Sequence, residues 1–409
     1  MALRNWGGNH QYRATSVERP ASEDELAALL AGGTVQVLGT RHTFSDIGDA
    51  DRLVSLDGLG ERFEVAADRR SVRVDGAMTY ARLAVLLEPT GLALRNLASL
   101  PHISIAGAVA TATHGSGLGN GNLATAVRNL TLVGPTGSRS FAATDADFAG
   151  VVVSLGTLGV VTELVLEVEP TYDIAQTVYR GVSWDRLLDR PESLLGSAYS
   201  VSAFTRFRDS VDALWVKRRV GRDVVGDEAV GLISETEMRH PIDGHPAEAC
   251  TPQFGVPGRW ADRLPHFRAD ATPSSGAEIQ SEYFVRLGDA AGAIEAIRSV
   301  AHRLDGVLLV CEIRTVAGDG LWLSPQGDGP TLALHFTWVD DSAMVQRAAT
   351  VVEQALEPFA PRPHWGKFFT PDLAVGARYR AADRFLDLQS RLDPGGVFRN
   401  AWFDRTLRS

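Results

Sequence analysis

The spacing of hydrophobic residues predicts alternating short strands and helices over residues 13–170. Leu26 and Leu30 recur at helical spacing behind a capping box made by Ser22 and Glu25, and a second helical pattern covers 79–88. Runs of strand character lie at 34–38, 52–56, 63–66, 71–74, 127–133, 138–141 and 160–168. The third and fourth runs, and the fifth and sixth, flank polar turns and therefore predict hairpins. A short helix is expected to open at 145–148.

The pattern changes after Pro170, where the chain becomes richer in Trp and Arg. Strands are expected at 213–220, 282–287, 306–314 and 331–339, and helices at 290–304 and 342–356. This alternation predicts one sheet with helices on one side. A Pro-, Gly- and His-rich stretch, 241–273, is expected to be a long loop, and 361–409 returns to short pieces ending in a helix, 383–391.

Composition narrows the class of protein. The chain has 409 residues, which is long enough for two or three domains, and its net charge of -10 argues against a nucleic-acid binder. The longest apolar stretch, 151–161, falls short of the ~18 residues of a membrane span. Residues 1–12 lack a signal-peptide core, and two cysteines form no disulfide framework or zinc motif. We expect a cytoplasmic protein in a reducing compartment, without a metal.

Common catalytic motifs are missing from the sequence. The glycines between Gly115 and Gly121 have the wrong spacing for a dinucleotide-binding fingerprint. Gly366-Lys367 is followed by Phe368 rather than Ser or Thr, so it is not a Walker loop. Zinc-protease and nucleophile-elbow motifs are also missing.

Two N-terminal segments have compositions that suit an anionic ligand. The loop 39–45 follows a strand and offers hydroxyls with Arg41 as a counter-charge, although a solvated loop would look the same. The segment 99–117 is rich in small residues that allow close backbone approach, and a helix starting near Ile103 would point N–H groups at an anion. A tightly packed helix is an equal alternative.

Two C-terminal segments carry charged residues in suggestive positions. Alternate residues of a strand share a face, so Glu312 and Arg314 would project together, with His335 on the next strand. Such a pair is most often a structural ion pair. Lys367 follows a Trp-Gly turn and would matter only if it were buried beside Arg314, where a second cation would lower its pKa or fix it as a hydrogen-bond donor.

Taken in this order, the segments resemble the vanillyl-alcohol-oxidase type of flavoprotein, and more narrowly the alditol (xylitol) oxidases. The similarity extends from Asn5-Trp6 to Asn400-Phe403 and rests on the Arg41–Phe44 and His364–Lys367 segments in combination, sharpened by Glu312-Ile313-Arg314. The resemblance implies an α+β, two-domain fold. An FAD-binding domain would comprise 1–170, completed by 366–409, and a cap or substrate domain, 171–365, would hold a mixed sheet covered by helices.

The resemblance also implies the roles of individual residues. FAD would be bonded covalently through His42, and Ala98 would control oxygen access beside the flavin. Arg314 and Lys367 would be catalytic, and together with Ser99, Glu312 and His335 they would bind the substrate. The remaining expected cofactor contacts are Gly39, Thr40, Arg41, Thr43, Ser45, Ser99, Ser104, Gly107, Thr111, Thr113, His114, Gly115 and Val160.

The implied activity is oxidation of the terminal hydroxyl of an alditol such as xylitol, sorbitol or glycerol, with oxygen reduced to hydrogen peroxide. The partners would be a small polyol and molecular oxygen, and the protein would be a monomer with no membrane or nucleic-acid partner. Three alternatives stay open. They are a gulono-, galactono- or arabinonolactone oxidase, a dehydrogenase of the same fold, and a carbohydrate-binding protein that kept the fold without activity.

Overall fold

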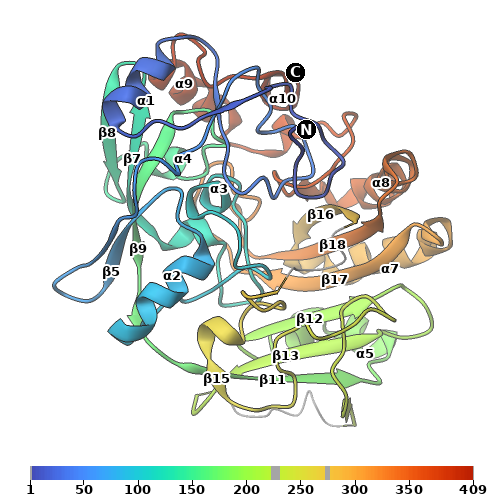
Figure 1. Cartoon of the computed structure of the whole chain (residues 1–409). Coiled ribbons are helices and arrows are strands. Elements are labelled where there is room, and N and C mark those ends of the chain that lie inside the picture. Colours follow the sequence, from blue (N-terminus) through green and yellow to red (C-terminus); the bar gives the residue numbers. More distant parts are fainter. Residues whose placement is uncertain (1, 223–230, 272–276, 409) are drawn as a thin grey trace.

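A computed structural model describes residues 2–222, 231–271 and 277–408. Figure 1 shows two sheets that face each other across the short helix α3. Among the described residues, no helix combines enough length and hydrophobicity to traverse a lipid bilayer.

The N-terminal part is built on a five-stranded antiparallel sheet with the order β4-β5-β9-β7-β8. Its strands are β4 (Phe63–Val65), β5 (Ser71–Asp75), β7 (Val127–Gly134), β8 (Gly137–Ala142) and β9 (Val160–Glu167). A small parallel sheet, β1-β3-β2, lies beside it and consists of β1 (Val17–Glu18), β2 (Gln36–Val37) and β3 (Leu53–Val54). The helices of this part are α1 (Glu23–Leu30), α2 (Tyr80–Leu87), α3 (Ile105–Ala110) and α4 (Phe148–Val151).

A two-stranded ribbon, β6 (Leu92–Ala93) with β10 (Glu169–Pro170), leads into a larger antiparallel sheet. The order is β14-β11-β13-β12-β17-β18-β16-β19, with β15 also paired to β11. The strands are β11 (Asp173–Arg180), β12 (Ser200–Thr205), β13 (Ala213–Arg219), β14 (Ile233–Ser234), β15 (Gly258–Arg259), β16 (Glu278–Arg286), β17 (Leu308–Val316), β18 (Thr331–Val339) and β19 (Arg362–Pro363).

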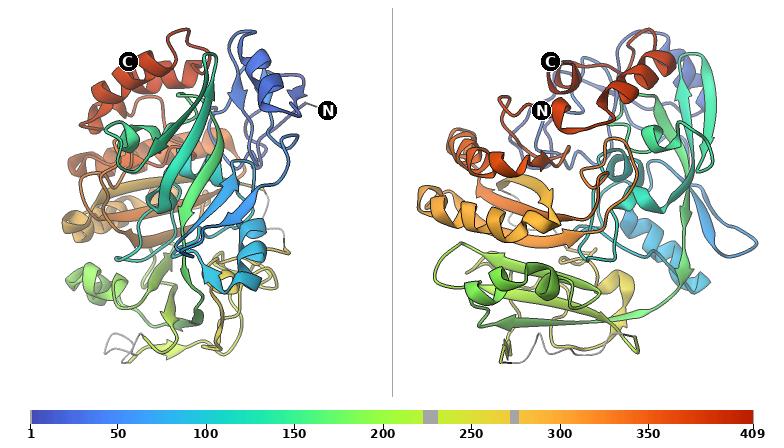
Figure 2. Two further views of the ribbon diagram at one scale, coloured as in Figure 1. Left: turned by 90° about the vertical axis from the view of Figure 1, so that its left-hand side faces the viewer. Right: turned by 180° about the vertical axis from the view of Figure 1, so that it is seen from behind.

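Helices cover one face of the large sheet. They are α5 (Trp184–Asp189), α6 (Pro191–Leu195), α7 (Ala290–Val300) and α8 (Ser342–Leu356). Seen from behind, α7 and α8 lie side by side over the large sheet (Figure 2). Ile294 and Ile297 of α7 and Val345 and Val352 of α8 are buried against the sheet. The opposite face is left for the site.

The chain then returns to the N-terminal part through α9 (Ala382–Leu392) and α10 (Ala401–Leu407). The Val35 N–H, just before β2, donates to the Val397 carbonyl at 2.8 Å. Asn400 caps α10 and also donates to the Ile47 carbonyl at 2.9 Å. These bonds attach the end of the chain to the residues on either side of β2. Single 3-10 turns lie at 88–90, 123–126, 260–262, 287–289, 301–304, 357–359 and 376–378.

The sequence patterns locate most of these elements correctly. Both hairpins form, and Ser22 and Thr79 cap α1 and α2 as their sequences predict. The helix expected near Ile103 starts two residues later, at Ile105. β16 begins at Glu278, four residues before the expected strand. The sequence pattern misses this start because the first residues of the strand are mostly polar. α10 lies beyond the helix that was expected to end the chain.

Candidate active site

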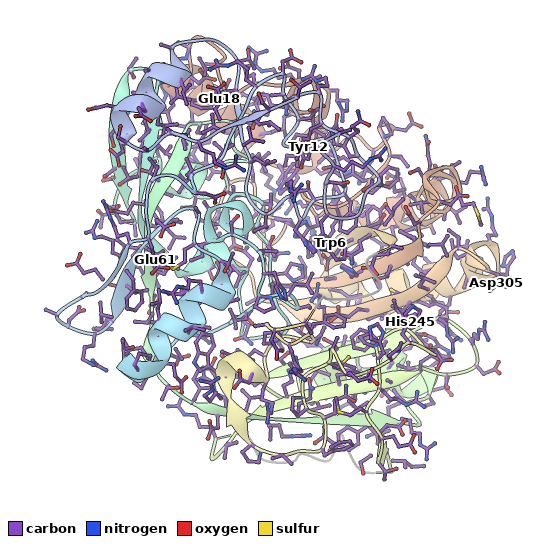
Figure 3. The ribbon with its side chains drawn as sticks, viewed as in Figure 1. Trp6, Tyr12, Glu18, Glu61, His245 and Asp305 are labelled. Atoms are coloured by element: carbon purple, nitrogen blue, oxygen red, sulfur yellow. The ribbon has the colours of Figure 1, made fainter. Side chains whose placement is uncertain are left out.

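The site is a cavity between α3 and the uncovered face of the large sheet. The empty space, counted together with the open mouth, is about 1490 Å³. Figure 3 shows Trp6, from the N-terminal segment, near the middle of the molecule, and Trp6 stacks on one of the lining residues, His42.

The loop after β2 forms one wall of the cavity. A Cβ at Gly39 would lie 2.6 Å from the Ser104 Oγ, so only glycine lets this loop approach the start of α3 so closely. Arg41 follows with a φ of 61°, a left-handed conformation that costs an ordinary residue about 1–3 kcal/mol. Strain of this kind is retained where the backbone has to present groups to a ligand.

His42 is held in this loop as a neutral imidazole. Its ring packs on Trp6 with centroids 4.5 Å apart, and its Nε2 has no hydrogen-bond partner among the described residues. Burial, with the nearby Lys367 and His102, lowers the His42 pKa to about 3. At neutral pH the side chain is therefore uncharged and keeps a free nitrogen lone pair, which makes it a competent nucleophile.

The start of α3 forms the adjoining wall. Ser104 is the N-cap residue, yet its side chain makes no capping hydrogen bond, so its hydroxyl is available to the cavity that it lines. A Cβ at Gly107 would lie 2.8 Å from the Ser104 Oγ. The helix has fewer spare donors than expected, because the Ile105 and Ala106 N–H groups already donate to the Met78 and Gly76 carbonyls. The fit to an anion here depends on hydroxyls and small residues more than on a free helix N-terminus.

The large sheet supplies a polar floor. Glu312 of β17 lies directly opposite His335 of β18, and His335 lies opposite Glu282 of β16. On the other side, Phe204 of β12 lies opposite Glu312. All four face the cavity, because residues paired across a sheet share a face.

Arg314 lies two residues after Glu312 on the same face of β17. Its Nη2 donates to the Glu282 Oε1 at 2.9 Å, and its Nη1 donates to the Ser99 Oγ at 3.2 Å and lies 3.5 Å from the Glu312 Oε1. Burial acts to raise the pKa of Glu282, but His114, Arg314 and His335 outweigh it and hold that pKa well below its usual value. The guanidinium is thus held between two ionised carboxylates and a serine.

Lys367 enters the cavity from the segment after β19. Its Nζ donates to the Gln280 Oε1 and lies 4.9 Å from the centroid of the Phe44 ring. Burial lowers the Lys367 pKa to about 8, with Arg314 acting in the same direction and Glu282 against it. The Phe44 N–H donates to the Gly366 carbonyl at 2.8 Å, which ties the lysine segment to the loop that carries His42. A lysine with this pKa can both donate and exchange a proton near neutral pH.

The cavity gathers most of the residues expected from the sequence. Those that line it are Gly39, Thr40, Arg41, His42, Thr43, Ala98, Ser99, Ser104, Gly107, Thr111, Thr113, His114, Glu312, Arg314, His335 and Lys367. Ser45, Gly115 and Val160 are not among its lining residues. Val160 packs in a small apolar cluster under α1, and a Cβ at Gly115 would lie 2.3 Å from the Leu97 carbonyl oxygen, which is a packing constraint.

The sequence interpretation missed several residues of the floor. Gln280 and Glu282 on β16, Thr337 on β18, His266 and His364 all line the cavity. The alternation of Gln280 and Glu282 was a usable signal for one face of a strand, but only the pairing of β16 with β18 shows that this face meets His335.

Three residues that line the cavity could in principle hold a metal ion, because their ligand atoms lie within 4.8 Å of one another. They are His114, Glu282 and His364. The His364 Nδ1 accepts from the Gly366 N–H at 3.0 Å, so a neutral ring carries its proton on Nε2 and has no free lone pair for a metal. The His114 Nε2 lies 3.1 Å from the Glu282 Oε1. A guanidinium 2.9 Å from the Glu282 Oε1 would repel a metal cation. The cluster is better described as a carboxylate surrounded by hydrogen-bond donors.

Two families of known proteins match parts of the chain. Residues 14–143 match an FAD binding domain, and residues 277–406 match D-arabinono-1,4-lactone oxidase. These ranges contain the loop of His42 and the strands of the polar floor.

Individual relatives match over nearly the whole length. An alditol oxidase from a Streptomyces species is 44% identical over 98% of both chains. An L-gulono-1,4-lactone dehydrogenase from Mycobacterium tuberculosis is 28% identical over 98% of both chains. Among solved structures, cholesterol oxidase from Brevibacterium sterolicum superposes with a TM-score of 0.78 at 17% identity, covering 99% of this chain and 96% of the other. That last likeness concerns the fold.

Proposed function

The chain belongs to the alditol oxidase family of FAD-dependent oxidoreductases, and we propose that it oxidises the terminal hydroxyl of an alditol to the aldose. The observation that carries this proposal is the cavity in which Arg314 and Lys367 accompany Glu312 and His335. Two cations suit a hydroxyl that develops negative charge, and a carboxylate with an imidazole suits the hydroxyls next to it.

The residues around α3 fit the cofactor. Side chains at Gly39 and Gly107 would fill the space beside Ser104, and the free hydroxyl of Ser104 offers a hydrogen bond. We propose that His42 forms a covalent bond to the flavin 8α-methyl group. Its support is the neutral ring with an unpartnered Nε2. When bound, FAD accepts the hydride of the alcohol and passes the electrons to oxygen.

The protein side of the reaction is positioning and charge stabilisation. Arg314 is fixed by Ser99 and Glu282, so its guanidinium can meet the reacting hydroxyl without reorganisation. Lys367 supplies a second donor. Glu312, His335 and Ser99 pair with the neighbouring hydroxyls, each of which would cost ~1–3 kcal/mol if buried without a partner. This lining favours polyols over simple alcohols.

We propose the same division of the chain as the resemblance implies. The FAD-binding part would be 1–170 with 366–409, supported by the bond between the Val35 N–H and the Val397 carbonyl. The substrate part would be 171–365, whose large sheet carries the polar floor. Ala98 lines the cavity with a small side chain, which leaves room for oxygen at that position.

One observation favours a second substrate class. The match of 277–406 to D-arabinono-1,4-lactone oxidase covers the strands that form the floor of the cavity. The lactone dehydrogenase, at 28% identity, is however more distant than the alditol oxidase at 44%. A sugar lactone is therefore the alternative substrate.

The test is an absorbance spectrum of purified protein, recorded without oxygen before and after addition of xylitol. We expect a flavin spectrum that bleaches with xylitol, and air should then restore it with formation of hydrogen peroxide. Bleaching by gulonolactone and not by xylitol would replace the alditol with the lactone. Acid precipitation tests the covalent bond, since a yellow supernatant would exclude it.

A further inference from the structure

A second group of charged residues lies beside the floor of the cavity, on the same face of the large sheet. Lys217 of β13 is only 1% exposed, and its Nζ lies 3.2 Å from the Pro265 carbonyl oxygen and 3.2 Å from the His266 Nδ1. A further acceptor is the Leu264 carbonyl. Burial lowers the Lys217 pKa to about 7, so the ammonium form predominates below that pH, and its three protons then have three acceptors. Within the part of the chain that the structure describes, no carboxylate lies within ion-pair distance of this Nζ.

His266 connects the lysine to the floor. Its Nε2 lies 2.9 Å from the Glu312 Oε1. Its ring is held edge-on by Phe204 and Trp215, with centroids 5.5 and 5.1 Å away. Its backbone N–H donates to the Ser99 carbonyl at 3.1 Å. One residue therefore holds the side chain of Glu312 and the backbone of Ser99, the two residues proposed to bind neighbouring hydroxyls.

The protonation states of His266 and Glu312 follow from the groups around them. Burial and Lys217 lower the His266 pKa to about 4, so the imidazole is neutral near pH 7. Burial acts to raise the Glu312 pKa, but Arg314 and His266 outweigh it and keep the carboxylate ionised. A neutral ring beside an ionised carboxylate must carry its proton on Nε2. The Nδ1 then has only a lone pair, which requires a donor, and Lys217 is that donor.

We infer that Lys217 and His266 are positioning residues that fix Glu312 as a permanent hydrogen-bond acceptor for a substrate hydroxyl next to the reacting one. Lys217 orients the 264–266 backbone and the ring, and the ring occupies Oε1 of Glu312. The other lone pairs of the ionised Glu312 can then only accept hydrogen bonds. They select a substrate that has a hydroxyl group next to the reacting one. A buried ammonium without a carboxylate is costly.

This inference rests on the proposed function, and it is tested with two substrates that differ by one hydroxyl. Glycerol and 1,3-propanediol both present a terminal hydroxyl, but only glycerol has its neighbour. Anaerobic flavin reduction is measured for both in the holoenzyme. In Lys217→Met and His266→Leu we expect the half-saturating glycerol concentration to rise ~10-fold or more, and that of 1,3-propanediol to change less than ~2-fold. An equal loss with both substrates would overturn the inference.

Two further variants separate positioning from general destabilisation. His266→Gln keeps an amide N–H that can donate to Glu312, so it should recover part of the glycerol affinity that His266→Leu loses. Val216→Ala removes buried volume from the same strand as Lys217 without changing Lys217, His266 or Glu312. It should leave the ratio of the half-saturating concentrations of glycerol and 1,3-propanediol unchanged. A Gln variant no better than the Leu variant would contradict the role of the donor.

A spectroscopic test does not depend on turnover. Protein labelled with ¹⁵N in histidine is compared at pH 6 with His266→Gln, which assigns the signal. We expect a neutral ring protonated on Nε2 in the unmodified protein, and a higher His266 pKa in Lys217→Met because the nearby cation is gone. A proton on Nδ1, or an unchanged titration, would overturn the inference. A flavin that neither alcohol reduces would defeat the proposed function while leaving this test decisive.

Discussion

At the scale of single residues, Arg314 and Lys367 reach the cavity from separate elements, β17 and the segment after β19. They lie close enough for Arg314 to contribute to the lowered pKa of Lys367. Each cation has a fixed partner, Glu282 for the arginine and Gln280 for the lysine. Two cations held in this way are in place before charge develops, which is the arrangement that lowers a barrier most.

We expect Arg314→Ala and Lys367→Ala each to slow anaerobic flavin reduction at least ~100-fold, the size seen when a preorganised donor to a developing oxyanion is removed. The measurement is the rate of bleaching at saturating xylitol. Arg347→Ala, which removes an exposed cation from α8, is the matched control and should be unchanged. Near-normal reduction in either active-site variant would remove that residue from the chemistry.

The lowered pKa of Lys367 predicts the pH dependence. The ammonium form predominates below about 8 and is lost as pH rises through that value. If the charged lysine stabilises the developing alkoxide, the rate of flavin reduction falls as pH rises above about 8. Lys367→Met should be slow and lack this limb. A rate that instead increases through pH 8 would show that the neutral amine acts, as the base that takes the hydroxyl proton.

At the scale of elements, a buried carboxylate joins a helix, a strand and the loop around Thr370. Glu353 of α8 accepts from the Tyr283 hydroxyl of β16 and from the Thr370 N–H, both at 2.8 Å, and also from the Thr370 hydroxyl. Burial raises its pKa although all three donors favour the charged form. This carboxylate fixes the chain just after the segment that carries Lys367.

Removing that carboxylate should therefore destabilise the protein. We expect Glu353→Ala to lower the free energy of unfolding by about 2–4 kcal/mol, because several buried donors lose their acceptor at ~1–3 kcal/mol each. Glu353→Gln, which keeps one carbonyl oxygen, should cost less. Denaturant unfolding measures both, against Gln354→Ala on the exposed side of α8. A loss within 0.5 kcal/mol of that control would show that water replaces the carboxylate.

Elements with a strong local pattern could be predicted from the sequence, and the shortest strands could not. The helix over 342–356 and the strand over 331–339 were predicted with the boundaries that α8 and β18 have. β2 and β3 keep only two residues each of the longer runs expected. After β2 the backbone turns into the loop that lines the cavity. Strand β12 was missed because its sequence, SVSAFT, lacks a clear alternation, although every residue of it is buried.

The same limit applies to the site. Glu312 and Arg314 could be placed on one face from their spacing within a strand, since local alternation decides which side chains share a face. His335 could be placed on the next strand, but its position opposite Glu312 depends on register. Glu282 and His266 could not, because their contacts join residues 32 and 46 positions apart through pairings that no local pattern specifies. Residues that only support other side chains of the site therefore cannot be predicted from the local sequence, because long-range strand pairing brings them there.

At the scale of the whole molecule, the cavity lies where the two sheets face each other. One wall comes from α3 and the loop of His42, and the floor comes from β16, β17 and β18. A cofactor in this position would contact both parts of the chain. Its binding free energy then adds to the stability of the complete fold.

This coupling predicts a specific result for His42→Ala. A covalently attached flavin cannot dissociate, so the melting temperature of the unmodified protein should not depend on added FAD. In His42→Ala the cofactor is held only by reversible contacts, and the melting temperature should rise with FAD concentration. The gain is ~2.7 kcal/mol at one hundred times the dissociation constant. Thermal unfolding of both proteins over a range of FAD concentrations measures it. If His42→Ala retains acid-stable flavin, or if its melting temperature ignores added FAD, the attachment site is elsewhere or the cavity does not hold the cofactor.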